Sequence, residues 1–270
     1  MQVVLLDMDG TLLEHRQKMK SDIRRRLVSL LDIAKVGIVS GSTFKDICHQ
    51  CDILWDSIAY CNLSNLRILP CNGTSAYSWV SGKGWQLDES YVMNDVIGED
   101  HFQILLRKLT SSQVQIVENC LEDFKLCPDF IDYRGSLINW CPIGRSSSKK
   151  ERKLFVDLDK KISIRDEMIR ILSSYLSEYQ FDLSKITIAK GGQTSLDIFP
   201  RGWDKTFAFD RYEEDISQMW FVGDACEEGQ NDYEIYQALK AHEQSFKTSG
   251  ADKTIIILDK IINTIKEGKS

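Results

Sequence analysis

The chain of 270 residues lacks an apolar run long enough to cross a membrane. A spanning helix needs about 20 consecutive apolar residues, and no segment approaches that length. The N-terminus also lacks the basic segment of a signal peptide, because its short apolar run ends at the carboxylates of Asp7 and Asp9. We therefore expect neither a membrane partner nor a signal peptide.

The chain also lacks an excess of positive charge. It carries 34 Lys and Arg against 40 Asp and Glu, a net charge of −6. A mildly acidic protein has no overall attraction for nucleic acid or for an anionic membrane. We expect no nucleic-acid partner, and any bound phosphate must be held by a local group of cations. No internal repeat or low-complexity tract is visible.

The eight cysteines are scattered through a long, enzyme-like chain. This distribution favours reduced thiols in the cytoplasm over a framework of disulfides. Cys48-His49-Gln50-Cys51 has the spacing of half a zinc site, but no second pair completes it. We therefore expect a cytoplasmic protein without structural zinc.

Three short apolar runs end in polar residues. Residues 3–6 precede Asp7, residues 36–39 precede Ser40-Gly41-Ser42, and residues 219–222 precede Gly223-Asp224. Continuous apolar runs of this length are typical of parallel strands that are buried on both faces. Sites of open α/β sheets lie beyond the carboxyl ends of such strands. We expect the three polar ends to converge on one crevice.

The middle of the chain has a different pattern from its two ends. Residues 21–31, 44–53 and 254–266 are predicted helices outside it. Within it we predict strands at 113–117, 130–133, 137–141, 185–189 and 195–199, and helices at 102–109 and 164–179. The prediction is an α/β protein whose doubly wound parallel-sheet core comprises residues 1–80 and 200–270. An α+β cap of residues 81–199 is inserted into it.

Asp7 and Asp9 have the spacing that phosphoryl transfer requires, since one carboxylate attacks phosphorus and the other handles the proton. The sequence D-x-D-G-T after an apolar strand resembles the nucleophile motif of the haloacid dehalogenase superfamily. Asp7, the backbone carbonyl of Asp9 and Asp224 would supply hard oxygen ligands for Mg²⁺. The alternative is an ordinary turn in which both carboxylates accept backbone hydrogen bonds.

Further motifs follow in the order typical of the superfamily. Ser40 or Ser42 can donate a hydroxyl to the transferring phosphoryl group, and the sequence does not distinguish them. Lys205 resembles the lysine that stabilises the phosphoaspartate. Asn231 and Asp232 would orient Asp224 or bind around the metal, although Asp232 could instead cap the helix that follows it.

A more specific resemblance is to the eukaryotic-type α-phosphomannomutases. It is carried by residues 16–18 (RQK), 72–73 (NG), 130–134 (FIDYR), 142–146 (PIGRS), 151–152 (ER) and 191–205 (GGQTSLDIFPRGWDK). The chain departs from the family at Cys71, where a glutamate is usual, and in the acidic stretch 225–228. The resemblance covers the cap as well as the core.

A hexose phosphate mutase must hold a second phosphate while the first one reacts, and arginine binds phosphate bidentately. Arg134, Arg145 and Arg152 are predicted to present this cluster from the cap, with Arg16 reaching it from the core. Ser195 and Asp197 alternate along a strand, so they share one face. They are predicted to bind phosphate and sugar hydroxyls.

The resemblance implies interconversion of mannose 6-phosphate and mannose 1-phosphate through an aspartyl-phosphate and a hexose 1,6-bisphosphate intermediate. It also implies Mg²⁺, a hexose 1,6-bisphosphate activator, a role in GDP-mannose synthesis and a homodimer formed through the caps. Glucose phosphates are possible additional substrates. The alternatives are a sugar-phosphate phosphatase, which the cap arginines disfavour, and a non-catalytic binding protein, which intact Asp7, Asp9, Lys205 and Asp224 disfavour.

Overall fold

The computed structural model describes residues 1–15, 17–55 and 62–268, so the predicted site residue Arg16 lies outside the described residues. The chain divides into two compact units. The core unit comprises Met1–Ser90 and Trp203–Ser270, and the cap unit comprises Tyr91–Gly202. No helix among the described residues combines the length and the apolar character needed to span a membrane.

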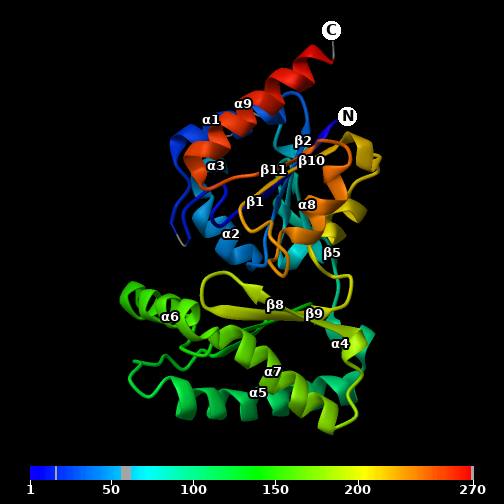
Figure 1. Ribbon diagram of the computed structural model, residues 1–270. Helices are drawn as coiled ribbons and strands as arrows, with labels where there is room; N and C mark the ends of the chain where they lie inside the picture. The colour runs from blue at the N-terminus through cyan, green and yellow to red at the C-terminus, as the bar shows by residue number, and fades with distance from the viewer. Residues whose placement is uncertain (16, 56–61, 269–270) are drawn as a thin grey trace. The chain divides into compact units, whose positions relative to one another are not determined.

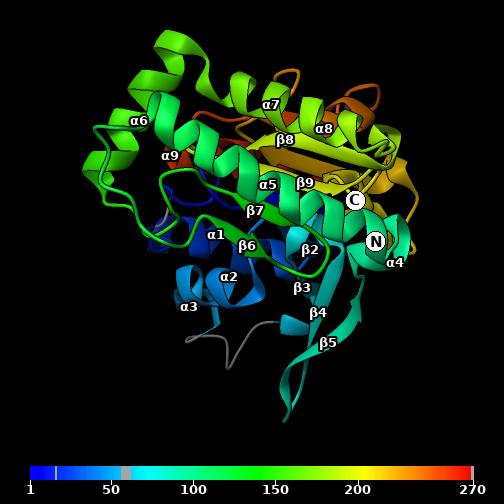
Figure 2. The ribbon, with the colours of Figure 1, turned by 90° about the horizontal axis from the view of Figure 1, so that it is seen from below.

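The core unit is built on a seven-stranded sheet in the order β11-β10-β1-β2-β3-β4-β5 (Figure 1). The strands from β11 to β3 run parallel, and β4 and β5 join antiparallel as a hairpin at one edge (Figure 2). Its strands are β1 Val3–Asp7, β2 Lys35–Val39, β3 Leu66–Leu69, β4 Ser75–Val80, β5 Gly84–Ser90, β10 Met219–Gly223 and β11 Ser245–Lys247. Its helices are α1 Ser21–Leu31, α2 Phe44–Gln50, α3 Asp52–Trp55, α8 Tyr233–Lys240 and α9 Ala251–Glu267.

Alternate residues of β1 are buried on opposite faces of this sheet. Val4 and Leu6 belong to the apolar cluster that includes residues of α1 and α9. Val3 and Leu5 belong to a second cluster, which includes residues of α8 and of the 3₁₀ helix η4, Lys205–Arg211. Burial on both faces explains the continuous apolar runs and gives the predicted doubly wound core.

The sheet register brings the predicted strand ends together. β10, β1 and β2 are neighbours, with Leu6 opposite Val222 and Asp7 opposite Val39. Asp7, Ser40 and Asp224 therefore lie at the same edge of the sheet, where β1, β2 and β10 end, as the three apolar runs predicted.

The cap unit contains a four-stranded antiparallel sheet in the order β6-β7-β9-β8. Helices α5 and α7 contact each other and lie along one face of this sheet (Figures 1 and 2). The indole of Trp140 ties β7 to α5, since its Nε1 donates to Gln113 Oε1 at 2.7 Å. The elements are α4 Met93–Ile97, α5 Glu99–Cys120, β6 Ile131–Tyr133, β7 Ile138–Trp140, α6 Lys149–Ile162, α7 Ile164–Glu178, β8 Ile186–Gly191 and β9 Ser195–Pro200.

The strand predicted at residues 113–117 is wrong, because this segment is part of helix α5. Its local alternation of polar and apolar residues is typical of a strand. Over the longer segment, however, Leu109, Ser112, Gln113 and Ile116 are buried at helical spacing. The helical spacing extends over all 22 residues of α5, whereas the strand-like alternation covers only five residues, so the segment is helical.

The unit boundaries also differ from the predicted ones. Residues 84–90, which the sequence assigned to the cap, form β5 and pair with β4 in the core sheet. Residues 200–202 belong to the cap unit, where the backbone N–H of Arg201 donates to Lys185 O at 2.9 Å. The helix predicted at 44–53 is interrupted at Cys51, which lies between α2 and α3.

Candidate active site

Three carboxylates, two buried and one half-buried, and one ammonium group meet at the carboxyl edge of the core sheet. Lys205, the first residue of η4, donates to Asp7 Oδ1 at 2.5 Å and also to Asp232 Oδ1. The side chains of Lys205 and Asp232 are fully buried. Asp224, directly after β10, is the third carboxylate of the group. Asp7 and Asp224 stand at two of the three strand ends that were predicted to converge, whereas Lys205 and Asp232 were assigned to the site through the superfamily motifs.

Two glycines allow the carboxylates to lie this close to the backbone. A Cβ atom on Gly10, whose φ is +87°, would lie 2.3 Å from Asp224 Oδ2. A Cβ atom on Gly223 would lie 2.4 Å from Asp232 Oδ2. Any side chain at either position would displace a carboxylate. Gly10 of the D-x-D-G-T motif thus forms the turn after β1 and also leaves room for Asp224, which follows β10.

The charges of this cluster are strongly coupled. Burial raises the pKa of Asp7 well above its usual range, and Asp232 and Asp224 raise it further while Lys205 opposes them. Burial also raises the pKa of Asp224, with Asp232 acting in the same direction. Burial alone would lower the pKa of Lys205, but Asp232 and Asp7 reverse this effect and the net shift is upward. The lysine therefore stays protonated, and the carboxylates favour additional positive charge.

The donor set fits a hard divalent cation. One oxygen from each of Asp7, Asp224 and Asp232 lies within 4.8 Å of the others. Asp7 Oδ2 is buried and has no hydrogen-bond partner among the described residues. A buried carboxylate oxygen in that state is costly unless it is bound to a cation. Among the described residues, no other group of His, Cys, Asp or Glu has this geometry.

Asp232 stands at the N-cap position of α8 but does not cap the helix with its side chain. Its carboxylate accepts from Lys205 and, through Oδ2, from the backbone N–H of Ala225 at 3.1 Å. The interactions therefore join Asp232 to the buried cluster. The neighbouring Asn231 is half-buried.

Asp9 lies outside the tight group of carboxylates. Its side chain is 26% exposed and has an oxygen 3.9 Å from His15 Nδ1. This partly exposed carboxylate, two residues beyond the buried Asp7, is accessible to a ligand and to water. The two aspartates of the motif thus have different environments, since Asp7 is buried and Asp9 is partly exposed to solvent.

Ser40 and Ser42 lie in the turn after β2. Ser40 is buried, and its Oγ accepts from the backbone N–H of Ser42 at 3.1 Å. The Ser40 hydroxyl therefore keeps its proton for donation, and its position follows Val39, the residue paired with Asp7. These contacts favour Ser40 over Ser42 as the hydrogen-bond donor to a bound phosphoryl group.

In the cap unit, two predicted arginines share one carboxylate. Arg134 Nε donates to Asp132 Oδ2 at 2.8 Å, and Arg145 Nη1 donates to the same oxygen at 2.6 Å. Arg152, in the first turn of α6, is half-buried. Asp132 thus holds two guanidinium groups side by side, a function that the sequence did not reveal.

Ser195 and Asp197 are joined by a second residue that sequence reasoning missed. Asn139 Nδ2 donates to Asp197 Oδ1 at 2.6 Å and to Ser195 Oγ at 3.0 Å. The register places Asp132 opposite Asn139 and Asn139 opposite Asp197, so one polar row crosses three strands. Knowledge of this strand pairing would have identified both Asp132 and Asn139, because each alternates with apolar neighbours.

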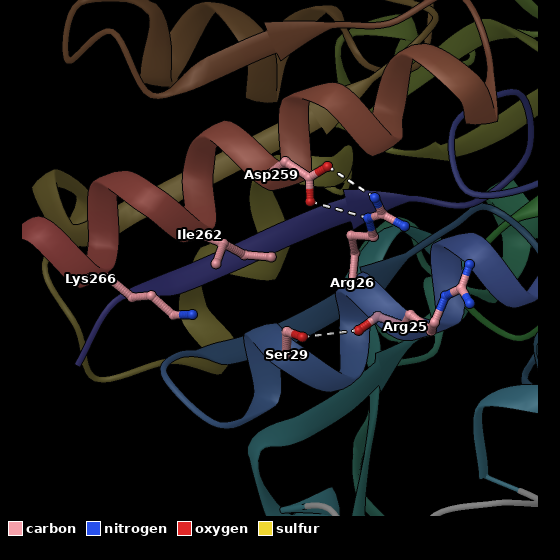
Figure 3. Close-up of a pocket in the computed structure, with 6 residues that line it drawn as sticks. All are labelled: Arg25, Arg26, Ser29, Asp259, Ile262 and Lys266. Carbon is pink, nitrogen blue, oxygen red and sulfur yellow. Dashed lines mark hydrogen bonds and ion pairs between the residues drawn. The ribbon is translucent and has the colours of Figure 1, made fainter.

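A pocket elsewhere in the core unit contains none of the predicted site residues. It lies between α1 and α9 and is lined by Arg25, Arg26, Ser29, Asp259, Ile262 and Lys266 (Figure 3). Arg26 Nε and Nη2 each donate to Asp259 at 3.1 Å, so the central cation is already neutralised. This pocket lacks the buried reactive groups of the Asp7 cluster.

Several solved structures have a similar fold at low sequence identity to this chain. An IMP-bound Plasmodium falciparum IMP-nucleotidase has a TM-score of 0.62 at 14% identity, covering 97% of this chain and 68% of that chain. A trehalose-6-phosphate phosphatase related protein has a TM-score of 0.51 at 14% identity, covering 99% of this chain and 100% of that chain. The core therefore has the haloacid dehalogenase-like fold that the D-x-D-G-T motif indicated.

Sequence comparison identifies the family. The family described as eukaryotic phosphomannomutase matches residues 23–264. A phosphomannomutase of Encephalitozoon cuniculi (strain GB-M1) is 33% identical over 275 residues, covering 98% of this chain and 95% of the relative. Phosphomannomutase 1 of Mus musculus is 31% identical over 236 residues, covering 86% of this chain and 82% of the relative. The chain belongs to the eukaryotic phosphomannomutase family.

Proposed function

We propose that the protein interconverts mannose 6-phosphate and mannose 1-phosphate, with Asp7 as the phosphoryl carrier. The observation that carries the proposal is the buried Asp7 carboxylate, whose Oδ1 is held by Lys205 while Oδ2 has no hydrogen-bond partner among the described residues. The hydrogen bond from Lys205 fixes the orientation of the carboxylate, so that one of its oxygens can attack phosphorus while the other binds the cation. The family match supports the sugar phosphate as its substrate.

In the first half of the reaction, Asp7 attacks one phosphorus of a hexose 1,6-bisphosphate. The phosphorus–oxygen ester bond breaks, and Asp9 gives its proton to the departing sugar oxygen. In the second half, Asp9 takes a proton from the hydroxyl of a hexose monophosphate, and that oxygen receives the phosphoryl group from Asp7. General acid–base help of this kind contributes ~10²–10⁴-fold.

Lys205 and the Ser40 hydroxyl would stabilise the charge on the phosphoryl oxygens during both transfers. Asp7, Asp9 through its carbonyl, and Asp224 would hold Mg²⁺, with Asn231 and Asp232 around them. Bound Mg²⁺ neutralises phosphate oxygens and so reduces their repulsion of the Asp7 carboxylate. The raised pKa of Asp7 is consistent with this need for a cation.

The cap residues are proposed to hold the phosphate that is not reacting. Arg134 and Arg145 are pre-oriented by Asp132, and Arg152 and Arg16 would add to them. Ser195 and Asp197, both bonded to Asn139, would bind phosphate and sugar hydroxyls. Two phosphate subsites are needed by a mutase and not by a phosphatase, so the arginines favour the mutase reaction.

The remaining proposals follow from the family resemblance. They are activation by a hexose 1,6-bisphosphate, a cytoplasmic role in GDP-mannose synthesis, a homodimer formed through the caps and some turnover of glucose phosphates. Closure of the site against water would keep the phosphoryl group on Asp7 until a sugar accepts it.

The test is ³¹P NMR of the purified protein with Mg²⁺, mannose 1-phosphate and a trace of glucose 1,6-bisphosphate. We expect a growing mannose 6-phosphate signal without free phosphate. Free phosphate without isomerised sugar would replace the mutase with a sugar-phosphate phosphatase that uses the same Asp7 chemistry.

A further inference from the structure

The loop after β3 has a backbone conformation that few residues adopt. Cys71, Asn72 and Gly73 have φ values of 51°, 64° and 87°, three consecutive residues in the left-handed region. Glycine adopts this region freely and asparagine tolerates it better than most residues, whereas cysteine does not. Strained backbone of this kind is kept only where surrounding contacts fix it.

Those contacts reach the loop that carries the two candidate serines. The backbone N–H of Asn72 donates to Ser40 O at 2.9 Å, and the N–H of Cys71 donates to Ser42 O at 3.2 Å. The left-handed conformation turns both amides toward the same neighbouring loop. The position of the Ser40 hydroxyl therefore depends on the conformation of residues 71 and 72.

The Asn72 side chain reaches the other side of the site. Its Nδ2 donates to Trp203 O at 3.3 Å, two residues before Lys205. Asn72 is only 3% exposed, and its Oδ1 has no hydrogen-bond partner among the described residues. Gly73 packs equally closely there, because a Cβ atom on it would lie 3.0 Å from the Ala208 backbone in η4.

We propose that Asn72 is a positioning residue that sets the distance between the Ser40 hydroxyl and the Lys205 ammonium group. Its backbone N–H is bonded to Ser40, and its side chain is bonded to Trp203, two residues before Lys205. Asn72 thereby links the two segments that carry the phosphoryl-binding groups. This inference rests on the proposed function, because that function assigns Ser40 and Lys205 to the phosphoryl group. Asn72 itself acts through these residues and is not assigned a contact with substrate.

The test variant is Asn72→Gly, which retains access to the left-handed region but removes the amide. Asn65→Gly is the matched control. Asn65 lies just before the opposite end of β3, and its Nδ2 makes the same kind of bond, to Leu31 O at 2.9 Å. Both variants lose one amide-to-carbonyl bond of the core unit, and only one of these bonds adjoins the Asp7 cluster.

The readouts are rapid-quench phosphorylation of Asp7 by labelled glucose 1,6-bisphosphate, steady-state kcat and KM, and the midpoint of thermal unfolding. Because small displacements of positioned groups cost up to ~10²-fold, we expect Asn72→Gly to lower the phosphorylation rate and kcat by about 10- to 100-fold. KM should stay within about twofold, since the cap residues proposed to bind the sugar and the second phosphate are unchanged. Asn65→Gly should lower the unfolding midpoint without lowering kcat.

Wild-type phosphorylation and kcat in Asn72→Gly would overturn the proposal, and so would an equal loss of kcat in Asn65→Gly. If Asn72→Gly does not fold, the isosteric Asn72→Asp replaces it, because that variant also loses the donor to Trp203 O and should show the same loss of kcat. A wild-type protein that phosphorylates Asp7 but releases free phosphate would refute the mutase reaction and leave the Asn72 comparison intact.

Discussion

The polar clusters of the core and of the cap differ in their exposure to solvent and in their position on the sheet. In the core, the Lys205 and Asp232 side chains are fully buried and Asp7 is 5% exposed. In the cap, Asp132 is 34% exposed and Arg145 is 23% exposed. The core cluster lies at strand ends, whereas the cap cluster extends across the face of a sheet.

This difference in solvation has chemical consequences. Charges interact strongly where water is excluded, so small changes in the core cluster alter both reactivity and stability. Partly exposed charges are screened and can bind and release a ligand at little structural cost. We therefore expect variants of the core to change chemistry and folding, and variants of the cap to change ligand capture.

The largest effect is expected from Asp7→Asn. The amide has the size of the carboxylate but cannot attack phosphorus, so turnover should fall by on the order of 10⁴-fold or more. The variant should fold, because the amide oxygen can still accept from Lys205. ³¹P NMR measures the turnover and circular dichroism the fold. Activity like that of the wild type would exclude Asp7 as the nucleophile.

Lys205→Met should distinguish the two clusters by stability. Removing the ammonium group leaves the buried carboxylates without their cation, which costs about 3–5 kcal/mol in the free energy of unfolding. Arg145→Met is the control, since Asp132 is partly exposed and keeps Arg134, and should cost no more than about 1 kcal/mol. Urea unfolding with a metal chelator measures both. Equal losses would mean that burial does not separate the clusters.

Arg145→Ala should weaken substrate capture while leaving the core chemistry intact. Loss of a charged hydrogen-bond partner should lower kcat/KM by ~1.5–3 kcal/mol, or about 10- to 150-fold. The control is Arg170→Ala on α7, because Arg170 is 67% exposed and pairs only locally with Glu167 among the described residues. An unchanged kcat/KM in Arg145→Ala would remove this arginine from the site.

The core cluster could be predicted from the sequence because its residues directly follow apolar runs. Asp7, Ser40 and Asp224 each stand at the end of a strand whose apolar residues are buried on both faces. Parallel strands place their carboxyl ends together, so sequence position alone brings these groups to one edge. Lys205 had no such pattern and was identified only through the family motif.

The cap was less predictable because its site depends on antiparallel pairing. Asp132, Asn139 and Asp197 lie in one row only because β6, β7 and β9 pair in a particular register. Three-residue strands carry too little periodicity to fix a register. The same weakness of short patterns produced the wrong strand at residues 113–117, which the longer helix α5 overrides.

The smallest predicted effect tests whether the core cluster needs a cation. Burial, with Asp232 and Asp224, raises the pKa of Asp7 above its unfolded value, so the folded protein holds this proton more tightly than the unfolded chain. Asp7 therefore contributes stability at low pH and loses that contribution as the pH rises through its folded pKa. Without metal, the unfolding midpoint of Asp7→Asn should rise relative to wild type as the pH increases.

Mg²⁺ should reverse this trend, because a cation bound to the ionised carboxylates stabilises the folded wild type and releases their protons. Scanning calorimetry across the pH range, with chelator and then with Mg²⁺, measures the gap between the two proteins. A gap that narrows with rising pH in chelator would mean that Lys205 already compensates the Asp7 charge. The core cluster would then need no added cation, like the Asp132 cluster of the cap. The two clusters would differ in the reactions of their side chains and not in their need for a metal.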